Sequence, residues 1–329
     1  MSLVHWSQLF RSQTAPATIL LVVVPFLLGG GVLFSWVGVV VLLFAWLVHL
    51  FSFGHNSLMD TQGGWDIEDK WKQHHPLVNG SISLGVAHNV VHSGVVLLGV
   101  LSVILAWCLP GNRFLVVVCF CLFVVTGHAY NDGMSKSTVW GFVPITISFM
   151  MLSLFGYYLV ATKMNWLMLG VVVYFGLALM FLISYSGHLK EIETGGANLL
   201  RRLGARVEGG VFKPGVAGFY GWGVKVLNLL VIWYILGQVA TCVVVWVVCG
   251  FLVVGILYLL VGLTTIRLWD RNRELRRMSL MEIATTYLLV VVLLPVIGYV
   301  EGVVLMVGGV VYFVVCNRLN WGTWLKPRV

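Results

Sequence analysis

Charge is scarce in this sequence: only 10% of its 329 residues are Asp, Glu, Lys or Arg, whereas 60% are hydrophobic. Soluble globular domains carry roughly 25% charged residues, so this composition excludes a water-soluble enzyme, a disordered chain and a coiled coil. Lipid is therefore the expected solvent for most of the chain. We expect an all-α polytopic transmembrane helical bundle in which residues 1–329 form a single integral-membrane domain.

Signals for cross-links and strands are lacking too. The six cysteines show no Cys-x-x-Cys spacing and no histidines at zinc-finger distances, which excludes a disulfide framework and a structural zinc site. No alternating barrel pattern occurs, so the spans are expected to be helices. Nine to ten apolar stretches approach the length that crosses a bilayer. The ten are roughly 15–34, 36–54, 82–108, 113–130, 140–161, 165–187, 217–239, 240–265, 280–299 and 301–317.

The placement of basic residues tests this count. With ten spans, only Arg113 and Lys163 of the 20 Lys and Arg residues fall on one side, and Lys225 lies within a span. The remaining seventeen mark the other side as cytoplasmic by the positive-inside rule. With nine spans, the basic residues would be distributed less unevenly between the two sides of the membrane. We therefore predict a multi-pass protein of the cell membrane whose net charge of +8 reflects insertion, with no nucleic-acid binding.

Acidic residues gather in two cytoplasmic loops, about 55–80 and 187–214, which hold seven of the twelve. In the first loop, Asn56 and Asp60 are four residues apart and share a helix face at the membrane boundary. Asp66 follows six residues later. Carboxylates at that depth are costly unless a cation or metal ion is paired with them.

The second loop holds Glu191 and Glu193 beside several cations. Two oxygen-rich clusters that face one cytoplasmic space suit magnesium, a hard ion bound through carboxylates and substrate phosphates. Basic side chains suited to diphosphate oxygens are Lys136, Lys190, Arg201 and Arg202. Ordinary solvated loop charges that fix the topology explain the same spacing equally well.

At these residues the sequence resembles the UbiA family of intramembrane prenyltransferases. That family has an Asn-x3-Asp motif after its second span, matched here by Asn56 and Asp60, and the place of Asp66 is similar to that in the menaquinone-type branch. The run 76–80, Pro-Leu-Val-Asn-Gly, resembles the family's Pro-Leu-x-x-Gly segment. His75 stands where the family commonly has Arg, and histidine is mostly neutral at pH 7.

The resemblance extends to later loops and covers about residues 15–300. Tyr130 with Lys136 is similar to a Tyr/Lys loop after the fourth span. The runs 189–193 and 199–204 resemble the family's second acidic motif, with Glu191 where the family usually has its first Asp and Glu193 as a nearby substitute.

The resemblance implies transfer of a prenyl group from an isoprenoid diphosphate to a lipophilic acceptor, with Mg²⁺ as cofactor. The implied metal ligands are Asn56, Asp60, Asp66, Glu191 and Glu193. The implied catalytic residues are Asp60, Asp66, Glu191 and Lys136. The implied substrate-binding residues are Asn56, Tyr130, Lys190, Arg201 and Tyr185, in which the two tyrosines offer aromatic faces to an allylic cation.

Other functions stay open. The menaquinone-like spacing favours an aromatic quinone precursor as acceptor. An ether-lipid glycerol phosphate or a carotenoid as acceptor is compatible with the same fold. So is a membrane terpene cyclase, which needs no acceptor. A polytopic transporter also fits ten spans, although transporters place polar residues near the bilayer midplane. Prenyl length and oligomeric state are not encoded in any motif.

Three further features have structural interpretations that we favour. His88 and His92 are spaced like a metal pair on one helix face, but interhelical hydrogen bonding explains them more simply. Asn131-Asp132-Gly133 is typical of a turn. Glu282 is expected to pair with the arginines of 273–277.

Overall fold

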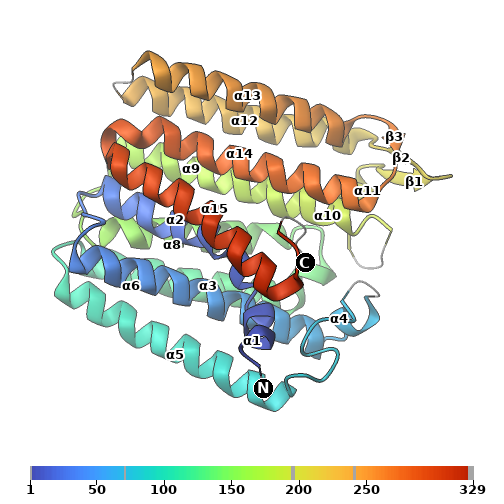
Figure 1. Ribbon diagram of the computed structural model, residues 1–329, viewed down its shortest axis with the longest axis horizontal. Coiled ribbons are helices and arrows are strands. Elements are labelled where there is room, and N and C mark those ends of the chain that lie inside the picture. The colour runs from blue at the N-terminus through green and yellow to red at the C-terminus, as the bar shows by residue number, and fades with distance from the viewer. Residues whose placement is uncertain (1, 70–71, 194–196, 240–241, 325–329) are drawn as a thin grey trace. The chain divides into compact units, whose positions relative to one another are not determined.

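Helices make up most of the chain in the computed structural model, which describes residues 2–69, 72–193, 197–239 and 242–324, without the side chain of Lys136 (Figure 1). The long helices are α2 (Ala15–Leu28), α3 (Trp36–Gln62), α5 (Leu84–Cys108), α6 (Arg113–Ala129), α8 (Phe142–Tyr158), α9 (Trp166–Phe181), α12 (Val216–Gln238), α13 (Val243–Thr264), α14 (Arg271–Ile297) and α15 (Tyr299–Trp321). The short helical elements are α1 (Leu3–Leu9), η1 (Ser12–Thr14), α4 (Trp65–Glu68), η2 (Tyr130–Met134), α7 (Ser135–Ser137), η3 (Leu182–Gly187), α10 (His188–Lys190) and α11 (Leu199–Arg202).

Each predicted span coincides with one long helix. Eight helices of the described chain are long and apolar enough to cross a membrane, and a ninth span arises if α1 and η1–α2, bent by 55°, are counted together. Helix α8 is apolar but has only 17 residues. The prediction of an all-α, polytopic membrane protein is confirmed, and the upper count of nine spans falls within the predicted range of nine to ten.

Polar caps set the starts of the spans. The side chains of Ser35, Ser83, Asn112 and Asn165 each accept a hydrogen bond from a backbone N–H in the first turn of the helix that follows. At the other end, Gly298 has φ +94°, a conformation that favours glycine, and it ends α14 directly before α15 begins. Capping Ser and Asn residues, and one glycine, therefore mark the boundaries between neighbouring apolar spans.

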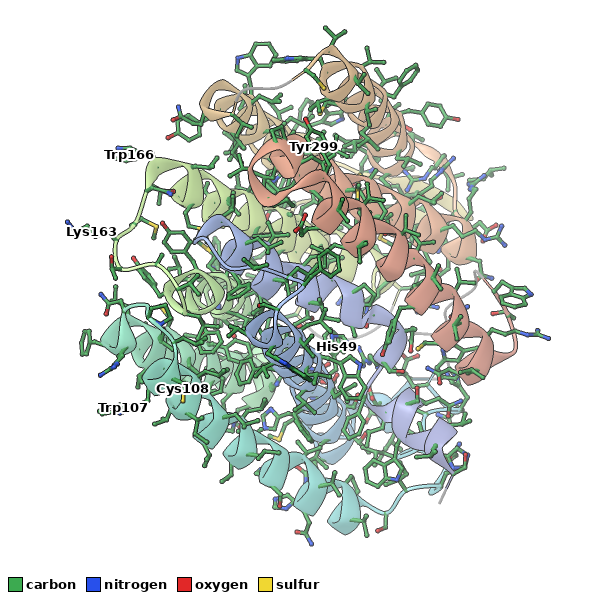
Figure 2. The ribbon with its side chains drawn as sticks, turned by 60° about the vertical axis from the view of Figure 1, so that its left-hand side comes forward. His49, Trp107, Cys108, Lys163, Trp166 and Tyr299 are labelled. Atoms are coloured by element: carbon green, nitrogen blue, oxygen red, sulfur yellow. The ribbon has the colours of Figure 1, made fainter. Side chains whose placement is uncertain are left out.

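The chain divides into two compact units. Unit 1 comprises Met1–Gly133, Met151–Lys163 and Val303–Val329, and unit 2 comprises Met134–Met150 and Met164–Gly302. In unit 1, α3 packs against α2 and α5, and α5 packs against α6. His49 of α3 lies inside this unit, fully buried, whereas Trp107 and Cys108 mark the end of α5 (Figure 2). His49 donates from Nε2 to the Arg11 carbonyl (3.1 Å) and accepts at Nδ1 from the Thr18 hydroxyl (2.9 Å).

In unit 2, α12 packs against α9 and α13, and α13 packs against α14 (Figure 1). A small antiparallel sheet is added at one end in the order β1 (Arg206–Glu208), β2 (Val211–Lys213) and β3 (Arg267–Leu268). Gly209 and Gly210, both with positive φ, form the two-residue turn between β1 and β2. This hairpin was not predicted from the sequence, although a Gly-Gly pair between two short alternating segments is a known signal for one.

A buried ion pair joins α12 to α14 within unit 2. Lys225, fully buried, places Nζ 3.2 Å from Glu282 Oε1 and donates a 3.0 Å hydrogen bond to the Thr285 hydroxyl. The expectation that Glu282 pairs with the arginines of 273–277 is wrong. Glu274, two turns earlier on α14, takes that role and lies 3.2 Å from Arg277. Glu282 is too far along the helix to share these partners.

We predict that Lys225→Met destabilises the protein by roughly 3–5 kcal/mol, because it leaves a buried carboxylate without its cation. The double variant Lys225→Met/Glu282→Leu should recover most of that loss, since neither charge remains. Unfolding of the detergent-solubilised protein by SDS titration measures both effects. Lys163→Met, at an exposed lysine (Figure 2), is the control; equal losses in the single and double variants would contradict the prediction.

Candidate functional site

The first acidic motif lies at the end of α3 and on α4. Helix α3 continues to Gln62, so Asn56 and Asp60 are one turn apart on it, and Asp60 is buried. The helix then ends at Gly63, and Gly64, at φ +81°, turns the chain into α4, which carries the buried Asp66. Because α4 packs on α3, the three predicted residues belong to one unit, two at the end of α3 and one on the adjoining α4.

Asp66 has one engaged and one unengaged carboxylate oxygen. Its Oδ1 lies 2.9 Å from Lys72 Nζ, whereas Oδ2 is buried with no hydrogen-bond partner in the described part of the chain. Burial raises the pKa of Asp66, but the charges of Lys72 and then Arg11 outweigh it and hold that pKa below its usual value. An ionised carboxylate with an unpartnered buried oxygen fits a hard divalent cation. From the sequence alone, Lys72 was interpreted only as one of the basic residues that set the topology.

Arg11 is a second cation that the sequence analysis did not assign to the site. It lies where the chain bends between α1 and η1, with φ +47°, a rare conformation for a non-glycine residue. Its guanidinium lies 5.9 Å from the centroid of the Phe53 ring. Burial lowers the pKa of Lys72 most, and the charge of Arg11 lowers it further, so the two cations act on one another. Only the fold reveals this, since 55 residues separate Arg11 from Asp66.

His75, in place of the family's usual Arg, lies buried, and neither ring nitrogen has a hydrogen-bond partner among the described residues. Burial, with a further contribution from the charge of Arg11, lowers the pKa of His75 to about 3. The residue is therefore neutral near pH 7, as the sequence analysis expected. The positive charge on this side of the motif comes from Lys72 and Arg11 instead.

Four histidines gather near Asn56 in unit 1. His88 and His92 stack with ring centroids 4.0 Å apart, and His92 Nδ1 donates to the His88 carbonyl (2.9 Å). The ring of His55 lies 5.9 Å from His92 and 5.3 Å from His128. In the described part of the chain, no three His, Cys, Asp or Glu side chains are arranged to hold a metal ion. His55 was not predicted from the sequence, although it directly precedes Asn56.

The second motif follows α9, which runs through the π-helical turn η3 into α10. Lys190 and Glu191 are half-buried at its end, whereas Glu193 is exposed and accepts a 2.9 Å hydrogen bond from Trp269 Nε1. Asn198 ties this loop together, since its Nδ2 donates to the backbone carbonyls of His188 (2.8 Å) and Glu191 (3.4 Å). The acids of this motif therefore lie in unit 2, on a loop with its own hydrogen-bond frame.

The remaining predicted residues lie at several places. Tyr185 is fully buried, stacks on Phe181 with centroids 5.0 Å apart, and donates its hydroxyl to the Leu263 carbonyl (3.2 Å). Arg201 is exposed on α11, and Tyr130 is half-buried at the start of η2. The side chain of Lys136 lies outside the described residues. Roles for these four residues stay predictions.

Comparison with solved structures identifies the fold. No model of a known protein family matches the chain, and no curated protein matches it in sequence. A structure of digeranylgeranylglyceryl phosphate synthase matches 90% of this chain and 98% of its own with a TM-score of 0.62 and 14% identity. A UbiA homolog from Archaeoglobus fulgidus bound to GPP and Mg²⁺ matches 92% of this chain and 99% of its own (TM-score 0.60, 13% identity).

A UbiA homolog from Archaeoglobus fulgidus bound to DMAPP and Mg²⁺ matches 94% of this chain and 98% of its own, with a TM-score of 0.56 and 11% identity. The chain has a UbiA-like fold. The resemblance predicted from short motifs is confirmed at this level, and the UbiA-like fold accounts for the long helices that carry both acidic loops.

We predict that His75→Gln removes part of the acid sensitivity of the fold. The pKa of His75 is about 3 when folded and 6.5 when unfolded, so the unfolded chain binds the extra proton as pH falls below 6.5. Between pH 7.5 and 5.0, the free energy of unfolding should therefore fall by about 2 kcal/mol more for the chain with His75 than for the variant. Chemical unfolding at the two pH values measures this.

His5→Gln, on the short α1 helix, is the control for that measurement because His5 is only half-buried. The lowered pKa of Asp66 affects stability only below its ordinary value of 3.8, outside the tested range. A parallel pH dependence in the native chain and the His75→Gln variant would show that His75 does not remain neutral in the fold.

Proposed function

We propose that this chain is an intramembrane prenyltransferase that moves a prenyl group from an isoprenoid diphosphate to a lipophilic acceptor. The observation that carries the proposal is the UbiA-like fold over 90% of the chain with Asn56, Asp60 and Asp66 at the end of its second long span. The Archaeoglobus fulgidus homolog was solved with DMAPP or GPP and Mg²⁺, which supports a diphosphate donor.

In this reaction the bond between the prenyl carbon and the diphosphate oxygen breaks, and its electron pair leaves with the diphosphate. A nucleophilic atom of the acceptor forms the new bond to the prenyl carbon and releases a proton. The demand on the protein is to neutralise the leaving group and to keep water from the allylic cation. The apolar composition of the spans is compatible with the second demand.

Asn56, Asp60 and Asp66 fit a divalent cation, since they offer amide and carboxylate oxygens and Asp66 Oδ2 is unpartnered. Mg²⁺ bound there supplies charge that stabilises the departing diphosphate. Lys72 and Arg11 hold positive charge beside the same carboxylate. We further assign Glu191 and Glu193 to a second cation, and Lys136, Lys190 and Arg201 to the diphosphate.

The two tyrosines are proposed to face the prenyl group. Because the Tyr185 hydroxyl is already donated to a backbone carbonyl, its contribution is the ring face, which attracts a cation without a proton transfer. Tyr130 begins the π-helical turn η2, directly after the span that ends near the histidines. We also place both motif loops on the cytoplasmic side, where the basic residues gather.

The acceptor is proposed to be an aromatic quinone precursor, on the strength of the six-residue step from Asp60 to Asp66. A glyceryl phosphate lipid is the second candidate, supported by the similarity to digeranylgeranylglyceryl phosphate synthase at a TM-score of 0.62. A carotenoid acceptor belongs in the same test. A terpene cyclase of this fold releases pyrophosphate without an acceptor, and a transporter releases none.

We predict that the purified protein in nanodiscs, given Mg²⁺, isoprenoid diphosphates and the three acceptor classes, forms a prenylated product detectable by mass spectrometry. Asp66→Asn should lower turnover roughly 100-fold or more, because it removes charge that holds the metal ion. Glu68→Gln, an exposed position on the same short helix α4, is the matched control and should retain turnover.

Several outcomes would contradict the proposal. Neither product nor pyrophosphate from any mixture, or unchanged turnover in Asp66→Asn, would exclude the assigned chemistry. Saturable substrate uptake into proteoliposomes without diphosphate release would identify a transporter. Pyrophosphate release that needs no acceptor would identify a cyclase.

A further inference from the structure

Asn131 occupies an unusual piece of backbone directly after α6. The helix passes into the π-helical turn η2, inside which Asp132 (φ −75°, ψ 41°) and Gly133 (φ +92°) leave helical geometry. Such π turns are frequent at functional sites because they redirect side chains that an α-helix would carry past. Here the turn brings Asn131 against α3, 75 residues earlier in the chain.

The side chain of Asn131 bonds to two neighbouring residues of α3. Its Oδ1 accepts a hydrogen bond from Asn56 Nδ2 (3.1 Å), and its Nδ2 donates to His55 Nδ1 (2.8 Å). Both ends of the amide are therefore used. The chain of bonds has one direction: with His55 Nδ1 as the acceptor, Asn131 must present its nitrogen to His55 and its oxygen to Asn56.

That direction determines which atom Asn56 offers to a metal ion. An asparagine amide has one oxygen and one nitrogen, and magnesium takes oxygen ligands. Because the Asn56 nitrogen donates to Asn131, the Asn56 oxygen takes no part in that bond and is the atom that can serve as a metal ligand. In the reverse direction, the Asn56 oxygen would accept from Asn131 and its nitrogen would face the metal ion.

We propose that Asn131 is a positioning residue that turns the Asn56 side-chain oxygen toward the cation of the first motif, and that His55 sets the direction of the Asn131 amide. The inference rests on the proposed function, since the cation is the one assigned there. Asn131 and His55 lie outside the acidic motifs, and the turn at 131–133 then has a role in metal binding as well as in redirecting the chain.

Mn²⁺ binding to the full-length protein in nanodiscs, followed by electron paramagnetic resonance, tests the inference without relying on turnover. Asn131→Leu should weaken Mn²⁺ binding roughly 10-fold, the loss typical of removing a group that orients a metal ligand. Asn131→Asp, which keeps an oxygen to accept from Asn56, should bind Mn²⁺ much as the native chain does. Thr126→Val, which removes a side-chain hydrogen bond one turn earlier on α6, is the control.

An Asn56→Asp background separates positioning from general damage. Aspartate has two oxygens, so its orientation no longer matters, and Asn131→Leu should have almost no further effect on Mn²⁺ binding there. Equal weakening in both backgrounds, loss of Mn²⁺ binding in Asn56→Asp alone, or normal binding in Asn131→Leu would each overturn the inference. Normal binding in Asn131→Leu together with product formation by the native chain would leave the proposed function standing. A native chain that binds no Mn²⁺ would defeat both.

Discussion

Each polar group inside the spans must find a protein partner, because lipid offers none. The buried side chains show how this constraint orders the helices. His49 satisfies both ring nitrogens within unit 1, and Lys225 finds an acid and a hydroxyl on α14. In unit 2, Tyr174 donates to the Thr285 carbonyl (2.6 Å), and Asn228 donates to the Tyr174 carbonyl (2.9 Å). These bonds fix the register of helices whose apolar surfaces would pack in many ways.

The same constraint explains where the regular helices stop. Both acidic motifs lie where the backbone leaves the long apolar helices, and there the geometry becomes irregular. Both α6 and α9 end in π-helical turns immediately before loops that carry predicted site residues. Gly64 and Gly133 adopt positive φ at corresponding places in unit 1. Irregular backbone at the ends of the spans thus allows side chains from distant segments to contact one another, as Asn131 contacts α3.

Composition and spacing were sufficient for what depends on helix length and local pattern. The ten long helices, and the placing of Asn56 and Asp60 one turn apart, follow from periodicity and the cost of charge in lipid. Contacts between segments far apart in the chain could not be predicted this way. Lys225 and Glu282 were each visible as charges within or near a span, yet a single sequence gives no rotation about the helix axis, and so Glu282 was assigned to the wrong partners. His55 and Arg11 were hidden for the same reason.

The end of α15 contacts both the N-terminal segment and the first motif loop. The Asn320 carbonyl, near the end of α15, accepts a 2.7 Å hydrogen bond from Gln8 Nε2, and its side chain donates to Gln13 Oε1 (2.9 Å). The ring of Trp321 meets His74 edge-on at 5.0 Å, next to the buried His75 of the first motif loop. Arg11 lies between Gln8 and Gln13, so the end of α15 braces the segment that carries the second cation of the motif. Changes at the end of α15 should therefore alter the environment of Asp66 through the charge of Arg11.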